Sequence, residues 1–356
     1  MAETHFGGIK IHHLYKIFGY SPKAHIDAIQ KGMTKAELNQ KHGHILGLRD
    51  INIEIPSGSI QVVMGLSGSG KSTLIRHINR LIDPTAGEVL VDGVDVVKMS
   101  ALELRAFRRH QTAMVFQKFA LLPHRSVLDN TVFGLEVQGT PRAKTVDVAM
   151  RWLERVGLKG FEQKYPNQLS GGMQQRVGLA RALSNDAPVL LMDEAYSALD
   201  PLIRMDMQTV LLDIQKEIKK TIVFITHDLD EALRLGDQIA ILRDGEIIQQ
   251  GTSQDIVLRP ADDYVANFVK EVNRGRVVHV EAVMTPLQST KAPTGQKVMA
   301  GTTVEEAVRM LTSVPDGDVT VVAASGEPLG FVTLRQLAGA MVNSQDSVGH
   351  SAHIAR

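Results

Sequence analysis

The feature that most constrains the fold is a glycine-rich segment at Gly65–Ser72, which reads GLSGSGKS. It matches the G-x-x-x-x-G-K-[ST] pattern of a phosphate-binding loop. The apolar run Ile60–Met64 precedes it and an amphipathic pattern follows, so the loop is expected to join a buried strand to a helix. One face of that helix is expected to carry Leu74, Ile75, Ile78 and Leu81.

The residue types in this loop predict how it binds a phosphate chain. Glycines let successive backbone N–H groups point at an anion, and the helix that starts there adds the positive end of its dipole. Lys71 is expected to reach the β- and γ-phosphates, and the Ser72 hydroxyl is expected to ligate Mg²⁺. The expected contacts to ATP from this segment are Gly65, Ser67, Gly68, Ser69, Gly70, Lys71, Ser72 and Thr73.

Two adjacent carboxylates, Asp193 and Glu194, follow the apolar run Val189–Met192. Ligands of open α/β sheets bind at the carboxyl ends of the strands, so both side chains are expected beside the phosphates. One of the two is expected to hold Mg²⁺, and the other to orient and deprotonate the attacking water.

Strand-like and helical patterns alternate from about residue 9 to residue 250, which indicates a mostly parallel α/β sheet. Around Glu88–Val96 the alternation EVLVDGVDV crosses a DG turn and predicts an antiparallel hairpin. Residues 21–45 are predicted to be helical, with Thr34 and Glu37 spaced as a capping box. The other expected strands are Ile60–Met64, Ala113–Phe116, Val189–Met192, Ile222–Ile225 and Gln238–Leu242.

A smaller pattern begins at about residue 277, with the order strand, helix, strand, turn, strand, helix. Thr303–Glu306 is expected to start its first helix, and strands are expected at Val319–Ala323 and Leu329–Thr333. The last residues, 344–356, are expected to form a mobile tail.

Composition limits the location and the partners. Lys plus Arg equals Asp plus Glu at 39 each, so no overall field favours nucleic acid as a partner. The chain has no cysteine, which excludes disulfides and suits a reducing compartment. No signal peptide and no apolar run of the roughly 20 residues needed to span a bilayer is apparent. We therefore expect a cytosolic protein, and any membrane role must come through a partner.

Other motifs reveal a family resemblance. The run LSGGMQQR at Leu169–Arg176 resembles the signature of ABC ATPases, which other P-loop proteins lack. Gln117 resembles the Q-loop glutamine, Ser197–Asp200 (SALD) the D-loop, and His227 the switch histidine. Phe18 stands where the family stacks an aromatic ring on adenine. The resemblance extends from residue 9 to about residue 272.

The resemblance implies a P-loop NTPase (RecA-like) ABC ATPase core within residues 1–275. An antiparallel β subdomain and a helical subdomain at about 118–175 are expected within it. It implies Glu194, His227 and Gln117 as catalytic residues, with Mg²⁺ held by Ser72, Gln117 and Asp193. Two copies are expected to close head to tail around two ATP molecules. The second copy then contributes Ser170, Gly171 and Gly172, and Asp200 is a further expected contact to the nucleotide.

The phrases NRLIDPTAGEVLVDGVD and MDEAYSALDPLIR, with the insert at 21–45, resemble the ATPases of glycine betaine/proline importers. This implies transmembrane permease subunits as partners, a substrate-binding protein as an indirect one, and a peripheral position on the cytoplasmic face of the membrane. An importer of choline, histidine or another amino acid is the main alternative. A soluble ABC protein of DNA repair or translation lacks support, because the chain has neither a long coiled-coil insertion nor a second cassette.

Residues 277–343 resemble a single CBS repeat, a regulatory α/β domain that usually occurs in tandem. Its sheet is expected to leave Val319, Val321 and Phe331 on an uncovered face. We therefore expect this repeat to pair with its twin across the ATPase dimer.

Overall fold

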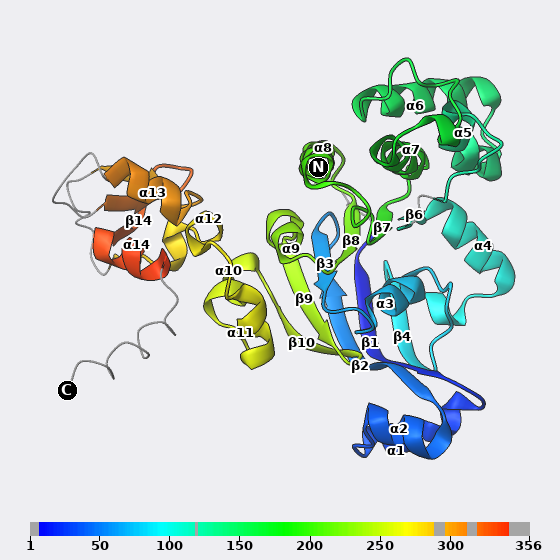
Figure 1. The fold of residues 1–356 in the computed structure, drawn as a ribbon, viewed down its shortest axis with the longest axis horizontal. Coiled ribbons are helices and arrows are strands. Elements are labelled where there is room, and N and C mark those ends of the chain that lie inside the picture. The colour runs from blue at the N-terminus through cyan, green and yellow to red at the C-terminus, as the bar shows by residue number, and fades with distance from the viewer. Residues whose placement is uncertain (1–6, 118–119, 288–295, 312–318, 342–356) are drawn as a thin grey trace. The chain divides into compact units, whose positions relative to one another are not determined.

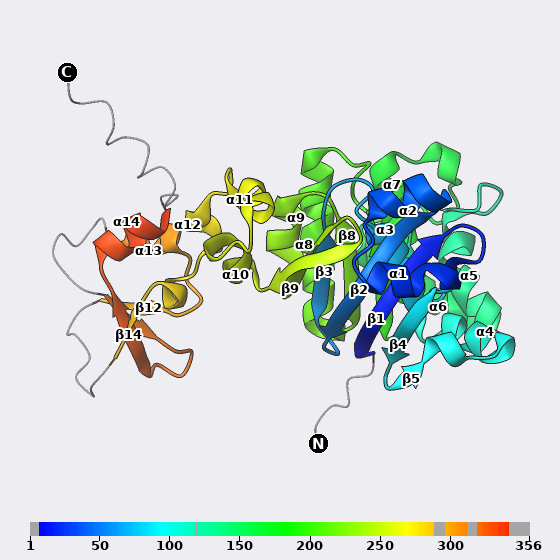
Figure 2. The same cartoon turned by 90° about the horizontal axis from the view of Figure 1, so that it is seen from below.

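The computed structural model describes residues 7–117, 120–287, 296–311 and 319–341. Backbone contacts divide the chain into two compact units, Met1–Gln250 and Gly251–Arg356, and each is described by itself (Figure 1; Figure 2). The predicted tail at 344–356 lies outside the described residues.

The centre of the first unit is a six-stranded sheet in the order β10-β9-β3-β8-β7-β6. Neighbouring strands from β9 to β6 run parallel, as the sequence predicts. Every residue of β3, β7 and β8 is buried, which explains their continuous apolar runs. The strands are β3 (Ile60–Met64), β6 (Thr112–Val115), β7 (Val189–Asp193), β8 (Thr221–Thr226), β9 (Gln238–Arg243) and β10 (Glu246–Gly251).

The strand register determines where the functional residues meet. Met64 at the end of β3 pairs with Thr226 at the end of β8. Asp193 at the end of β7 pairs with Ile225 of β8. The three strands therefore end side by side, and the loops that follow them leave from one edge of the sheet.

A second, antiparallel sheet has the order β2-β1-β4-β5. The hairpin predicted around Glu88–Val96 is confirmed, and its turn residues Asp92 and Gly93 have φ values of 49° and 78°. One apolar core contains residues of both sheets, among them Ile11, Ile53, Val63 and Leu191. The strands are β1 (Ile9–Phe18), β2 (Ile45–Ile55), β4 (Ala86–Val91) and β5 (Val94–Asp95).

Helices flank the sheets of this unit. Helices α5 and α6 lie in the range predicted for a helical subdomain, and both contact α7 (Figure 1). The helices are α3 (Lys71–Ile78), α4 (Ala101–His110), α5 (Val127–Gln138), α6 (Arg142–Arg155), α7 (Gly171–Ser184), α8 (Pro201–Ile218) and α9 (Leu229–Leu235). The 3-10 turns are η2 (Val96–Lys98) and η3 (Pro166–Gln168).

The expectation that Leu81 continues the apolar face of α3 is wrong. The helix ends at Ile78, and Leu81 is 49% exposed. Arg80 has a φ of 49°, which stops the helix. Arg108 of α4 donates hydrogen bonds to the carbonyl groups of Asn79 and Arg80, so the end of the helix is held by a distant side chain.

The insert at residues 21–45 is helical as predicted, but it forms separate short pieces. They are η1 (Pro22–His25), α1 (Ile26–Gln30) and α2 (Lys35–His42). The capping box of Thr34 and Glu37 is present at the start of α2. Ile29 and Leu38 pack with Tyr15 of β1 in a small core of their own.

The second unit holds a four-stranded sheet in the order β11-β14-β13-β12. Strands β12 and β13 are parallel, and β13 and β14 are antiparallel. The expected succession of strand, helix, strand, strand and helix is present. The elements are α10 (Ser253–Leu258), α11 (Asp263–Val269), α12 (Arg274–Val277), η4 (Val280–Ala282), β11 (Thr285–Pro286), β12 (Lys297–Met299), α13 (Val304–Leu311), β13 (Val319–Val322), β14 (Pro328–Val332) and α14 (Leu334–Met341).

The prediction that Val319 and Val321 lie on an uncovered sheet face is wrong. Both valines are buried, at 4% and 0% exposure. Val319 lines one small cavity together with Ala307 and Leu311, so the apolar stripe of α13 covers this part of the sheet. This unit therefore does not need a twin to bury these valines.

Candidate active site

The predicted phosphate-binding loop lies between β3 and α3, and close packing requires two of its glycines, Gly65 and Gly70. Gly70 has a φ of 107°, and a Cβ atom there would lie 2.7 Å from the carbonyl oxygen of Gly47. A Cβ atom at Gly65, where φ is 150°, would overlap the carbonyl oxygen of Leu242. A larger residue at either position would deform the turn that aims the backbone N–H groups.

Two serines of this loop differ in their surroundings. Ser67 is exposed, whereas Ser69 is buried and its hydroxyl has no hydrogen-bond partner in the described part of the chain. A buried hydroxyl without a partner is costly, and a bound phosphate is one group that could satisfy it. This observation fits the nucleotide that the sequence predicts.

Lys71, the first residue of α3, is 4% exposed. Its ammonium group donates hydrogen bonds to the carbonyl oxygens of Gly65 and Leu66, at 2.8 and 3.0 Å. Burial lowers the pKa of Lys71, while the nearby carboxylates of Glu194 and Asp193 act in the opposite direction. The loop thus wraps around a buried cation, which is a suitable arrangement for an oligophosphate.

Ser72 and Asp193 form an oxygen-rich pair at the predicted Mg²⁺ position. The Ser72 hydroxyl donates to Asp193 Oδ1 at 2.7 Å, and Arg76 donates to Asp193 Oδ2 at 3.0 Å. Hydroxyl and carboxylate oxygens are the ligands that Mg²⁺ prefers, so these two residues fit the ion. Arg76 was not predicted, although its spacing of four residues from Ser72 places both on one face of α3.

The carboxylate of Glu194 is the point where the predicted catalytic residues meet. Glu194 Oε2 accepts a hydrogen bond from Gln117 Nε2 at 3.1 Å and lies 3.6 Å from His227 Nδ1. Glu194 Oε1 lies 3.9 Å from the Lys71 ammonium. The φ of Glu194 is 47°, so the chain leaves β7 through a left-handed residue, and its N–H donates to the carbonyl of Ile225.

Ser197 also belongs to this cluster, although it was not predicted as a site residue. Its hydroxyl donates to the carbonyl oxygen of Glu194 at 3.0 Å and lies 3.4 Å from Gln117 Nε2. It therefore helps to position the turn that carries Glu194.

The aromatic residue predicted for adenine lies near the glycine-rich loop. Phe18 ends β1 and is 38% exposed, with the Lys16 ammonium 5.0 Å from its ring centroid. A Cβ atom at Gly47 would lie 2.7 Å from the Phe18 ring, and the carbonyl of Gly47 also limits the space at Gly70. One glycine thus separates the aromatic ring from the phosphate-binding turn.

The signature segment is not joined to these residues within the chain. Ser170 caps α7, and its hydroxyl accepts a hydrogen bond from the N–H of Met173 in the same helix. A Cβ atom at Gly172 would lie 2.7 Å from Ile203 on α8. Asp200 caps α8 by accepting from the N–H of Ile203. The signature therefore packs against the first turn of α8, which directly follows the D-loop.

Sequence comparison connects this geometry to a known group of proteins. The profile of the ABC transporter family matches residues 48–197. The chain is 50% identical over 290 residues to the glycine betaine transport ATP-binding protein OpuAA of Bacillus subtilis, covering 82% of this chain and 69% of that protein. The chain belongs to the ABC transporter ATPases. The predicted ABC ATPase fold and the predicted hydrolysis of ATP are thereby confirmed, and this ABC ATPase is the ATP-binding component of a transport system.

Two further relatives are similar to this ABC ATPase. ProV of Salmonella typhimurium, a glycine betaine/proline betaine transport ATP-binding protein, is 52% identical over 76% of this chain and 67% of its own length. TmoW of Ruegeria pomeroyi, a trimethylamine N-oxide transport ATP-binding protein, is 44% identical over 90% of this chain and 93% of its own length.

Among solved structures, the chain resembles MJ0796, a bacterial ABC transporter cassette determined as a dimer. The TM-score is 0.59 at 32% identity, over 69% of this chain and 98% of the cassette. Within the described ranges, no helix of this ABC ATPase combines the length and apolar character that a membrane span requires.

Proposed function

We propose that this ABC ATPase powers the import of a small solute with a trimethylated or similarly substituted cationic nitrogen, such as glycine betaine or proline betaine. The observation that carries the energy-coupling role is the convergence of Lys71, Ser72, Asp193, Glu194 and His227 at one edge of the central sheet. The solute class is supported by the names of the relatives.

In the proposed site the glycine-rich loop, residues 65–70, holds the phosphates together with Lys71, Ser72 and Thr73. Phe18 stacks on the adenine. Ser72, Asp193 and Gln117 hold Mg²⁺, which neutralises charge on the phosphate oxygens. Glu194 accepts the proton of the attacking water, and His227 contacts the γ-phosphate.

The signature completes this site from a second copy of the chain. Within the described part of the chain, the Ser170 hydroxyl bonds to its own helix, and the N-terminus of such a helix is well suited to bind a phosphate. We therefore place these residues and Asp200 against the nucleotide of the partner copy in a head-to-tail dimer. The similar cassette MJ0796 was solved as a dimer.

The names of the relatives point to one solute chemistry. Glycine betaine and trimethylamine N-oxide, the solutes in the names of OpuAA and TmoW, both carry a trimethylated nitrogen. Membrane crossing is assigned to separate permease subunits, and the ATPase binds them at the cytoplasmic face of the membrane. A substrate-binding protein selects the solute and acts on this chain only indirectly. An importer of choline, histidine or another amino acid remains the second candidate.

We assign residues 1–275 to the ABC ATPase domain and residues 277–343 to a single CBS-like regulatory domain. The succession β12, α13, β13, β14 and α14 supports this assignment. The match to TmoW extends over 322 residues, which are 90% of this chain and 93% of TmoW.

The first test concerns Glu194. Glu194→Gln keeps the size of the side chain but cannot accept a proton, so steady-state hydrolysis of ATP should fall by about 10²–10⁴-fold. ATP should still bind, because Lys71 and the loop are intact. The matched control is Glu217→Gln on α8, whose carboxylate is 62% exposed and pairs with Arg155, and it should hydrolyse ATP at the normal rate. Normal turnover by Glu194→Gln would disprove its role as base.

The second test concerns the solute. The ATPase is reconstituted with its permease and binding protein, and ATP-dependent uptake of labelled glycine betaine is measured. Excess unlabelled trimethylamine N-oxide or proline betaine should compete, and histidine should not. Uptake of histidine or another amino acid, without uptake of betaine, would replace the proposed solute class by the second candidate.

A further inference from the structure

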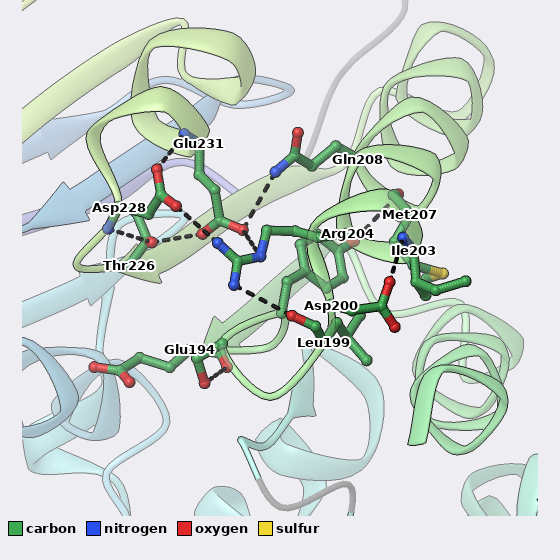
Figure 3. Close-up of polar contacts among 12 residues, drawn as sticks. Glu194, Leu199, Asp200, Ile203, Arg204, Met207, Gln208, Thr226, Asp228 and Glu231 are labelled. Carbon is green, nitrogen blue, oxygen red and sulfur yellow. Dashed lines mark hydrogen bonds and ion pairs between the residues drawn. The ribbon is translucent and has the colours of Figure 1, made fainter. Parts of the chain in front are cut away.

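A network of charged residues joins the first turn of α8 to the loop that carries His227 (Figure 3). At its centre is Arg204, which lies in α8 just after the D-loop and is 24% exposed at its side chain. Arg204 itself was not predicted as a site residue.

The guanidinium of Arg204 makes contacts in two directions. One direction is towards the loop that carries His227, which we call the switch loop. There its NH1 group donates to Asp228 Oδ2 at 2.8 Å, and Nε lies 3.7 Å from Glu231 Oε1. Towards the D-loop, its NH2 group donates to the carbonyl oxygen of Leu199 at 3.3 Å. One planar group therefore spans both loops, and Figure 3 shows it between them.

The residues on both sides of His227 are held tightly. Thr226 donates its hydroxyl proton to Glu231 Oε2 at 2.5 Å and accepts from the N–H of Asp228 at 3.0 Å. Asp228 caps α9 by accepting from the N–H of Glu231. The imidazole of His227 itself is 55% exposed, so its position depends on this backbone rather than on packing of the ring.

Arg204 is the cation that this acidic cluster requires. Glu231 is 4% exposed, and burial raises the pKa of its carboxyl group. The nearby Asp228 acts in the same direction, whereas Arg204 and the hydrogen bonds from Thr226 and Gln208 oppose it. Without Arg204, two neighbouring carboxylates would lie together with no countercharge at close range.

The other side of the network reaches the surface proposed for the dimer. Asp200, the last D-loop residue, caps the helix turn that contains Arg204. Ile203 in the same turn packs against Gly172 of the signature. A displacement of the D-loop or the signature would therefore move the helix turn on which Arg204 is carried.

We propose that Arg204 is a positioning residue that ties the D-loop to the switch loop, so that closure of the dimer on the D-loop also sets the position of His227. This inference rests on the proposed role of His227 in hydrolysis. Arg204 touches no nucleotide in this proposal and acts through Leu199 and Asp228.

Arg234 provides a matched control, because it joins the same two helices without touching either loop. It lies on α9 and donates to Gln208 and Thr209 of α8, at 3.0 and 2.8 Å. If Arg204 only held α9 against α8, its replacement would change the hydrolysis rate as little as the replacement of Arg234.

The experiment measures kcat and KM for MgATP on the full-length chain, with single turnovers of labelled ATP for slow variants. Arg204→Met should lower kcat by about 10–100-fold, as expected for a misplaced catalytic group, with KM changed by less than about threefold. Arg204→Lys should recover only part of the rate, because lysine cannot present several fixed donors. Arg234→Met should stay close to the wild-type rate.

The decisive arm is a double-mutant cycle with His227→Ala. Because Arg204 acts through His227, adding Arg204→Met to His227→Ala should change the rate by less than about twofold. Three results would each overturn the inference. They are the same fold-loss of rate when Arg204→Met is added to the wild type and to His227→Ala, a normal rate for Arg204→Met, and a rate for Arg234→Met as low as that of Arg204→Met.

Two outcomes separate this inference from the proposed function. A normal rate for His227→Ala would remove both the role of His227 and the coupling through Arg204. A defective His227→Ala with a normal Arg204→Met would remove only the coupling. If Arg204→Met does not fold, Arg204→Lys and Asp228→Asn take its place in the cycle, and the same outcomes apply.

Discussion

His77 shows how one buried residue of the phosphate-binding helix α3 makes stability depend on pH. It is 1% exposed, and its Nδ1 atom lies 2.7 Å from the carbonyl oxygen of Thr73. A carbonyl only accepts, so Nδ1 carries the proton, and Nε2 is buried with no hydrogen-bond partner in the described part of the chain. A second proton would create a buried cation, and burial lowers the pKa of His77 to about 4, although the carbonyl of Thr73 and the charge of Asp83 act in the opposite direction.

This lowered pKa predicts a loss of stability in mild acid. The unfolded chain, with an ordinary histidine, takes up a proton below about pH 6.5 while the folded chain does not, so stability falls as the pH drops towards 4. Between pH 7.5 and pH 5.5 the free energy of unfolding should fall by about 1.4 kcal/mol from this group. Urea unfolding of wild type and His77→Gln at both pH values isolates the effect, because other groups cancel. A difference between the two proteins that does not change with pH would contradict the expected titration.

At the scale of elements, the site is built from strand ends and helix starts. The glycine-rich loop follows β3, the carboxylate pair ends β7, and His227 follows β8. Because these strands are parallel neighbours in register, their ends present all three groups at one edge. The signature and the D-loop instead begin α7 and α8, and their caps hold them with local hydrogen bonds.

At the scale of the whole molecule, the proposed site is divided between two chains. The half with Lys71 and Glu194 is assembled within one chain, whereas the Ser170 hydroxyl caps its own helix and Gly172 packs against Ile203 of α8. A single copy is therefore expected to bind ATP without completing the site.

Mixing of inactive variants tests this division. Lys71→Ala and Ser170→Arg should each be inactive alone, and their heterodimers should recover part of the ATPase activity. One of their two sites carries both defects and the other is intact. Lys71→Ala mixed with Glu194→Gln is the matched control, because both changes lie in the same half and no intact site can form. Equal activity in the two mixtures, with heterodimers demonstrated, would show that the sites are not shared.

The sequence by itself determined the elements and the chemistry that depend on neighbouring residues. The apolar runs identified β3, β7 and β8, the DG turn identified the β4–β5 hairpin, and Thr34 with Glu37 identified the start of α2. The glycine pattern 65–70 identified the phosphate-binding turn, because only residues without a Cβ atom adopt that backbone in so little space. These features are local, so a short stretch of chain contains the information.

Only the tertiary structure decided which distant side chains meet. Arg108 holds the end of α3 where the apolar spacing predicted continuation, and α13 packs near Val319, which was expected to need a partner. Arg204 reaches Asp228 across 24 residues of chain, and Gln117 reaches Glu194 across 77. Such pairs depend on how helices pack on the sheet, and no spacing along the chain encodes that geometry, because contacts between elements are set by the burial of whole faces.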